Sequence, residues 1–284
     1  MMTIAKRNMK LFFRDKSSVF FSLLAVFIII GLYVFFLGDV VTSGMEGFAN
    51  PAFLINSWIM GGMLAVTSIT TTMGAFGIMV EDRAKKIIKD FYSSPIKRTK
   101  LAGGYIVAAV AVGIIMSLVT LLLAEIFIVS KGGQWLGFED LTEVLGLIVL
   151  SVLSGSAMVF FVVSFFSSTN AFATASTVLG TLIGFLTGIY VPIGELPASV
   201  QFVIKCFPPS HAAALLRQSM MEKAINVNFS GLPSQYLDSF NESMGVILKF
   251  GEHVVSKQES VLILIATTVV FYALSVLNLS RKLK

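Results

Sequence analysis

Long apolar runs alternate with short polar segments along the chain, and they dominate its pattern. A helix needs about 20 apolar residues to cross a hydrocarbon core about 30 Å thick, because its backbone must be satisfied within the segment. Six runs meet that length. We predict six membrane spans at Val19–Leu37, Ala52–Val80, Leu101–Val129, Val144–Phe166, Ala171–Val191 and Ser260–Leu279. The pattern therefore predicts an all-α membrane protein.

The segment before the first span has the pattern of an amphipathic helix. Four cations fall on one side of a helix over residues 4–14, namely Lys6, Arg7, Lys10 and Arg14. Ile4, Ala5, Met9, Phe12 and Phe13 fall on the opposite side. Such a helix lies along the inner leaflet with its basic face toward anionic headgroups. Two interpretations remain open, a simple anchor and a rigid lever that meets a cytoplasmic partner.

The segment 81–100 between the second and third spans has a similar pattern. Ala84, Ile87, Ile88 and Phe91 form one apolar stripe, and Lys85, Lys86 and Lys89 lie opposite. Ser93-Ser94-Pro95 ends the predicted helix, because proline disfavours helical geometry in the residue before it. A short helix of this kind can dock into a groove of another protein.

The segment 192–259 is too long for a simple loop. Pro192 and Pro197 interrupt an apolar stretch that is too broken for a span. A polar insertion follows at about 225–259, and we interpret it as a small extracellular cap. The chain thus divides into a cytoplasmic helix at 1–18, five spans at 19–191, this outer segment at 192–259, and a last span with its tail at 260–284.

The composition agrees with a membrane protein and excludes other classes. Of the 284 residues 56% are hydrophobic and only 13% are charged, and the mean hydropathy is +0.86. That charge is too sparse for a soluble, disordered, coiled-coil or nucleic-acid-binding protein. The single cysteine, Cys206, excludes an intrachain disulfide, and no Cys/His cluster has the spacing of a metal site.

The basic residues are distributed unevenly between the two sides of the predicted bundle. Segments 1–18 and 81–100 and the C-terminal tail hold five, seven and three of them, which is fifteen of the chain's 21. Basic residues near span ends stay on the cytoplasmic side. We therefore expect a multi-pass protein of the cell membrane with both termini in the cytoplasm, and the net charge of +5 requires no nucleic-acid partner.

The string from Lys85 to Arg98, KKIIKDFYSSPIKR, is followed by Leu101 and Gly103-Gly104. It resembles the cytoplasmic segment of type-2 ATP-binding-cassette (ABC) exporter permeases, where a Ser-Pro shortly precedes a basic residue. In that family the segment forms the coupling helix that seats on the nucleotide-binding subunit. The resemblance implies that the coupling residues here are Ile87, Ile88, Asp90, Phe91, Tyr92, Ser94 and Pro95.

A second stretch is similar to the same family. Gly188–Pro197 reads GIYVPIGELP, and FPPSH at 207–211 and Leu216-Arg217-Gln218 follow. In the family the fifth span ends here, a hydrophobic hairpin re-enters the outer leaflet, and a Pro-rich turn precedes an Arg-containing helix. The resemblance implies an outer gate at Tyr190, Pro192, Glu195 and Pro197. With the opening elbow from Arg7-Asn8 to Arg14-Asp15-Lys16 it covers nearly the whole chain, except for residues 225–259.

The chain has no GxxxxGK[ST] string and no cytoplasmic stretch long enough for a nucleotide-binding fold, so we expect no enzyme activity of its own. The resemblance implies an ABC nucleotide-binding subunit that holds ATP and Mg²⁺, with no cofactor on this chain. It also implies a second permease subunit in a homodimer or a paralogous heterodimer. A drug, an antimicrobial peptide or a lipid-like molecule fits as the exported compound, with multidrug efflux as one such role.

Small and hydroxyl residues mark two spans as a pathway wall or a dimer seam. The fifth span places a ridge at four-residue steps, Ser176, Gly180, Gly184 and Gly188. The second span has one polar face that includes Ser57, Ser68, Thr71 and Thr72. These hydroxyls suit a pathway, but bonding to their own helix carbonyls is the commoner fate. Bulky replacements at Thr71 or Gly184 are expected to impair export and leave folding intact.

Glu125 is the only acid inside a predicted span, and its distance from Leu101 places it near the outer interface. We favour a structural or interfacial role there over a gate or substrate contact. An ion-coupled carrier needs ionisable groups near the midplane, and their absence from the predicted spans favours an ATP-coupled permease. A carrier of that kind and a non-transporting membrane sensor or assembly protein remain the alternatives.

Overall fold

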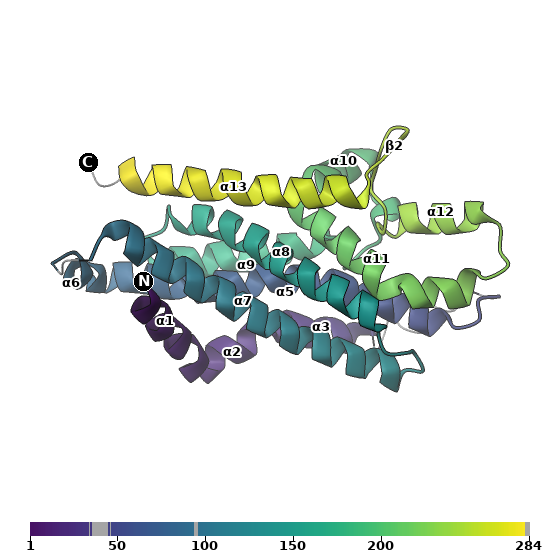
Figure 1. Ribbon diagram of the computed structural model, residues 1–284, viewed down its shortest axis with the longest axis horizontal. Coiled ribbons are helices and arrows are strands. Elements are labelled where there is room, and N and C mark those ends of the chain that lie inside the picture. The colour runs from purple at the N-terminus through teal and green to yellow at the C-terminus, as the bar shows by residue number, and fades with distance from the viewer. Residues whose placement is uncertain (34, 36–44, 46, 94–95, 282–284) are drawn as a thin grey trace.

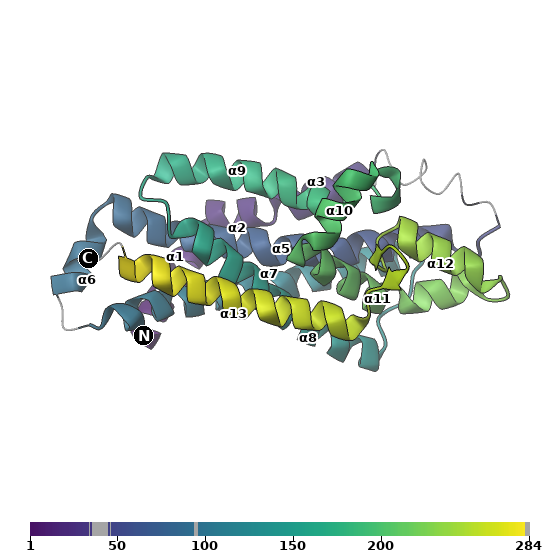
Figure 2. The same ribbon diagram turned by 90° about the horizontal axis from the view of Figure 1, so that it is seen from above.

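The computed structural model describes residues 1–33, 35, 45, 47–93 and 96–281, which form a helical bundle elongated along one axis (Figures 1 and 2). Helix α6 (Ile87–Ser93) lies at one end, here called the α6 end, and α12 (Ser234–Ser243) lies at the other, the α12 end. The N-terminus and the last turn of α13 (Lys257–Arg281) both lie at the α6 end.

The centre of the bundle is α5 (Pro51–Ala84), and most of its side chains are buried. It starts where Asn50 caps the helix by accepting a hydrogen bond from the Phe53 amide at 3.0 Å, and Pro51 occupies the first turn. Helices α7 (Arg98–Ser130), α8 (Phe138–Val163) and α11 (Pro208–Phe229) pack around it. The polar network, the groove and the Arg217 contacts described below all include residues of this helix.

Five helices of the described chain are long and apolar enough to cross a membrane: α5, α7, α8, α9 (Thr169–Leu186) and α13. They correspond to the second to sixth predicted spans. The first prediction, Val19–Leu37, differs, because the chain there forms two short helices, α2 (Lys16–Ser22) and α3 (Leu24–Leu32), joined at Leu23. Residues 34, 36 and 37 of that prediction lie outside the described residues.

Two helices end elsewhere than the hydropathy predicts. Helix α5 continues four residues past Val80 and so includes Glu81 and Asp82, which the sequence assigned to a loop. Helix α9 ends at Leu186 instead of Val191. Gly188 follows it with a φ of +65°, a left-handed conformation that stops the helix and that glycine adopts without strain.

The segment 192–259 is folded and not a loop. It begins with the short helices η2 (Ile193–Glu195) and α10 (Ala198–Cys206), which occupy the place of the predicted re-entrant hairpin. Helix α11 then packs along α5, and α12 follows at the bundle end. The sheet of the described chain is one antiparallel pair, β1 (Lys249–Phe250) with β2 (His253–Val254). The predicted polar cap therefore contains the last turns of α11, α12 and this hairpin.

Glycines set the distance between neighbouring helices. A Cβ on Gly155 of α8 would lie 2.9 Å from the Ile69 Cγ1 atom of α5, and one on Gly113 of α7 would lie 2.7 Å from the Thr72 Cγ2 atom. Small residues at such crossings are what allow close packing in lipid. The close packing of α7 and α8 against α5 thus requires glycine at positions 113 and 155.

Replacing Gly155 by leucine is expected to lower the apparent melting temperature of the purified protein. Overpacking costs about 1–3 kcal/mol, because leucine would force α5 and α8 apart. Gly146→Leu on the same helix is the matched control, since a Cβ there meets no atom within 4 Å. Equal melting temperatures for the two variants in a detergent unfolding assay would contradict this account of the packing.

Candidate functional site

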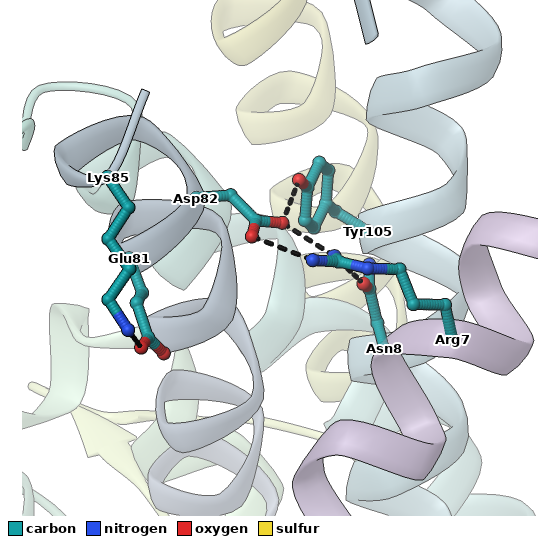
Figure 3. A network of polar contacts seen from close by, with 6 residues as sticks. All are labelled: Arg7, Asn8, Glu81, Asp82, Lys85 and Tyr105. Atoms are coloured by element: carbon teal, nitrogen blue, oxygen red, sulfur yellow. Dashed lines mark hydrogen bonds and ion pairs between the residues drawn. The ribbon is translucent and has the colours of Figure 1, made fainter. Parts of the chain in front are cut away.

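A network of polar contacts joins three helices at the α6 end (Figure 3). The Arg7 guanidinium of α1 (Met2–Arg14) donates to both carboxylate oxygens of Asp82, at 2.7 and 2.9 Å. The Tyr105 hydroxyl of α7 donates to Asp82 Oδ2 at 2.5 Å. Arg7 also donates to Asn8 Oδ1 at 2.9 Å. One carboxylate on α5 therefore fixes both α1 and α7.

The position of Asp82 explains why it needs these partners. Its side chain is 3% exposed and lies in the last turn of α5, where the helix dipole disfavours negative charge. The bidentate guanidinium and the phenol compensate for both burial and dipole. The hydrogen bond with Asp82 and its charge in turn raise the pKa of Arg7 above its ordinary value. Arg7 therefore keeps its charge at physiological pH beside this carboxylate.

Arg7 corrects one sequence expectation, because it turns into the bundle instead of facing headgroups with the other cations. Lys6, Lys10 and Arg14 are exposed as predicted. Helix α1 lies close to α7 because Gly104 has no side chain, and a Cβ there would lie 2.7 Å from Ile4 Cβ. Helix α1 is therefore docked on the bundle.

Helix α6 follows α5 through a sharp turn at Lys86, whose φ of +62° is unusual for a residue with a side chain. Ile87, Ile88 and Phe91 are half-buried against the bundle, whereas Lys89 and Asp90 are exposed. Ala84 belongs to α5 and not to this helix. The Arg7 guanidinium carbon lies 5.5 Å from the centre of the Phe91 ring, which links α6 to the network. The Tyr92 side chain, Ser94 and Pro95 lie outside the described residues.

A groove starts at this network and runs along α5 between α2–α3 and α9. It consists of two adjoining cavities of about 730 and 660 Å³, which share Ser18, Gly74 and Phe172. The first is charged, and its lining includes Arg7, Asp15, Glu81, Asp82 and Lys85. The second is lined by apolar side chains and by hydroxyls, among them Ser22, Thr70, Thr177 and Thr181. The groove is polar at one end and amphipathic along its length.

The predicted small-residue ridge of α9 divides between two environments. Ser176 and Gly180 line the groove, and a Cβ on Gly180 would meet nothing within 4 Å. Gly184 and Gly188 are buried instead. A Cβ on Gly184 would lie 2.2 Å from the Tyr190 ring, so Tyr190 must move to admit a larger residue there. The expectation that a bulky variant of Gly184 folds normally stays a prediction.

The predicted polar face of α5 is buried within the subunit. Thr71 donates to the Thr67 carbonyl at 2.7 Å, Thr72 to the Ser68 carbonyl at 2.9 Å and Ser68 to the Ala65 carbonyl at 2.7 Å. Ser57 is fully buried, and its hydroxyl has no hydrogen-bond partner among the described residues. Three of the four predicted hydroxyls thus bond to their own helix, as the commoner interpretation predicts, and a pathway role for the four stays a prediction.

The predicted outer-gate residues lie together near the α12 end. Tyr190 lines the end of the groove and packs edge-on against Phe185 at 5.0 Å between ring centres. Pro192 precedes η2, Glu195 ends it, and Pro197 caps α10. A Cβ on Gly194 would lie 2.8 Å from Ser243, so η2 packs directly against α12. Their role as a gate stays a prediction.

Glu125 occupies the α12 end of α7. It accepts a hydrogen bond from the Leu136 amide at 2.9 Å, and Lys223 donates to the neighbouring Trp135 carbonyl at 2.8 Å. These contacts hold the connection between α7 and α8, which is a structural role. Sequence reasoning missed Asp82 as a buried acid within the long helix α5. Its signal was its position seven residues after Ala75, on the polar face that continues from Thr71.

The comparisons with known proteins agree with this arrangement. A family model described as ABC-2 family transporter protein matches residues 41–277. The match includes Asp82, Tyr105, α6 and all five candidate spans as far as residue 277 of α13. The comparison with curated proteins finds no match.

The Arg7–Asp82 pair is expected to behave as one unit in a double-mutant cycle. Arg7→Gln should destabilise more than Asp82→Asn, because it leaves a buried carboxylate without its cation, whereas Arg7 can turn to water. We expect a coupling of about 0.5–3 kcal/mol in unfolding experiments on the purified protein.

The exposed Lys85–Glu81 pair on the next turn provides the control for that cycle, and Glu81→Gln should change nothing measurable. Additive effects of Arg7→Gln and Asp82→Asn would show that the two side chains do not interact.

Proposed function

Since the chain belongs to the ABC-2 transporter family and is a membrane permease of an ABC transporter, we propose that it exports a hydrophobic or amphipathic compound. A drug, an antimicrobial peptide or a lipid-like molecule fits this proposal. Transport proceeds by alternating access, with ATP and Mg²⁺ in a separate nucleotide-binding subunit. Membership of the family implies such an ATPase partner and typically a second permease.

The groove along α5 is the observation that supports an amphipathic substrate. Its charged end can hold a polar headgroup, and its apolar length can hold hydrocarbon, which is the division that an amphiphile requires. The hydroxyls of Thr177 and Thr181 already bond to carbonyls of α9, so they offer only weak further contacts to a substrate. Weak contacts suit transport, because a substrate that is held tightly is not released.

The α6 end supports coupling to the ATPase. Helix α6 presents Lys89 and Asp90 to the outside, and its inner face contacts the Arg7–Asp82–Tyr105 network through Phe91. A push on α6 therefore acts on α5, α1 and α7 together. The same network lines the charged end of the groove. ATP hydrolysis in a partner can in this way change the shape of the groove.

The distribution of side chains supports an orientation in the cell membrane with both termini in the cytoplasm. The N-terminus and the last described turn of α13 lie beside α6 at the end where basic residues gather (Figure 1). At the other end, Trp135 on the connection between α7 and α8 is 58% exposed, and Phe138 at the start of α8 is 83% exposed. Aromatic residues of this kind mark a membrane interface.

The exposure of α9 supports a second permease subunit at this face. Only 11% of the apolar window of α9 is buried within the chain, against 78% for α5. A second copy or a paralogous permease that covers α9 would close the groove from the side. The substrate would then move between two subunits.

Asp90→Lys is expected to weaken the complex with the ATPase subunit by at least about tenfold, or about 1.4 kcal/mol, because it reverses a charge on the exposed face of α6. Asp238→Lys on α12, an exposed acid at the opposite end, is the matched control. The measurement is co-purification, followed by the ATPase activity of the complex. Equal binding by both variants would remove α6 from the coupling interface.

Gly180→Phe is expected to abolish stimulation of the ATPase by an amphiphile while the protein folds normally, because the ring fills an open part of the groove. Gly146→Phe, which also meets open space, is the control. The assay uses the reconstituted complex with an amphipathic dye, a cationic peptide and a short-chain fluorescent phospholipid. Unchanged stimulation in Gly180→Phe would show that the groove is not the substrate path.

A further inference from the structure

Arg217 of α11 is a fully buried arginine whose charge the mechanism above does not use. Among the residues that the structure describes, no carboxylate forms an ion pair with it. A buried charge without compensation costs several kcal/mol, so the surroundings of this side chain must supply negative potential in another form.

Backbone carbonyls and one aromatic ring supply that potential. The guanidinium donates to the Gly188 carbonyl at 3.0 Å and, at 3.4 Å, to the carbonyls of Trp58 and Gly245. Its central carbon lies 4.6 Å from the centre of the Trp58 ring. The indole Nε1–H of Trp58 donates to the Met244 carbonyl at 2.7 Å. One side chain thus connects α11 with α5 and with two turns.

Both turns are helix C-termini. Gly188 follows α9 and Gly245 follows α12, and their φ angles of +65° and +64° are those of the residue that ends a helix in the left-handed conformation. The C-terminal ends of these helices carry partial negative charge. Arg217 therefore binds carbonyls directly after two helix C-termini, where that potential favours a cation without a carboxylate.

The sequence makes room for this arrangement with a glycine pair on α5. A Cβ on Gly61 would lie 2.9 Å from the Arg217 Cα atom, and one on Gly62 would lie 2.7 Å from its Nη2 atom. A larger residue at Gly61 would push the α11 backbone away from α5, and one at Gly62 would displace the guanidinium from the carbonyls. Gly61-Gly62 and Arg217 are therefore one structural unit.

We propose that Arg217 is the latch that holds the α12 end closed, by binding the C-terminal turn of α9 to α5, α11 and α12. This inference rests on the proposed function, in which the wall of the groove formed by α9 must separate at this end to release the substrate. Separation breaks the bond to the Gly188 carbonyl. Water then enters and solvates the guanidinium, so its charge is stabilised in the open state as well as in the closed state.

A reporter cysteine at Thr187 tests the latch. Thr187 is fully buried beside Gly188, and its hydroxyl bonds to its own helix, so Thr187→Cys changes little. Cys206 is exposed and is first replaced by serine. In the purified protein we expect Arg217→Met to raise the labelling rate of the reporter by a small charged thiol reagent at least tenfold. An unchanged rate in the folded variant would overturn the proposal.

Arg83→Met is the matched control for this experiment. Arg83 also donates to helix-end carbonyls, those of Val163 and Phe166 at 3.1 and 3.0 Å, but at the α6 end. Its loss should leave labelling of Thr187→Cys within twofold of the parent. An increase equal to that of Arg217→Met would mean general loosening and would overturn the latch.

Labelling during turnover tests the latch with Arg217 in place, should Arg217→Met fail to fold. In the complex with an active ATPase, ATP should raise the labelling rate of the reporter, and a constant rate would overturn the proposal. The Arg217→Met measurement needs neither ATP nor substrate, so it tests the latch independently of the proposed export function. If Arg217→Met raises the labelling rate of Thr187→Cys but the complex exports no compound, the latch is supported and the proposed function is rejected.

Discussion

The ion pair between Arg7 and Asp82 is the constraint on which the α6 end depends. A carboxylate in the last turn of a buried helix is unfavourable both for its burial and for the helix dipole, so α5 can hold Asp82 there only with a cation against it. That cation must come from α1, which is therefore drawn onto α5 and α7. The charged end of the groove and the support of α6 both follow from this one requirement.

The α12 end of the bundle also contains a buried charge, but it is stabilised in a different way. There a buried cation, Arg217, is held by dipoles and carbonyls instead of by an anion. Separating Arg7 from Asp82 would leave a carboxylate stranded, whereas separating Arg217 from its carbonyls leaves only groups that water satisfies readily. In the proposed mechanism the α6 end accordingly moves as one body, and the α12 end opens.

The sequence predicted those features that depend on local composition. Five of six predicted spans, the helix in segment 81–100 and the amphipathic N-terminal helix are all present in the described chain. What it did not predict depends on long-range contacts. The inward turn of Arg7 requires Asp82, 75 residues away, and the early end of α9 is fixed by Gly188, whose neighbour Arg217 lies 29 residues further on. Hydropathy also placed Asp82 in a loop, because charged residues look like a span end even where the helix continues.

The buried charges of Asp82 and Arg217 also explain why α5 is the helix that connects both ends. It supplies Asp82 at one end, and Trp58 with the Gly61-Gly62 pair at the other. At about 1.5 Å per residue its 34 residues extend about 50 Å, which exceeds the hydrocarbon thickness. A continuous helix of that length joins the two ends, and the hydroxyls of Ser68, Thr71 and Thr72 bond to carbonyls of the helix itself. In the proposed mechanism, a shift of α5 that begins at the α6 network reaches the Arg217 contacts through this one helix, and the groove between them lies along it.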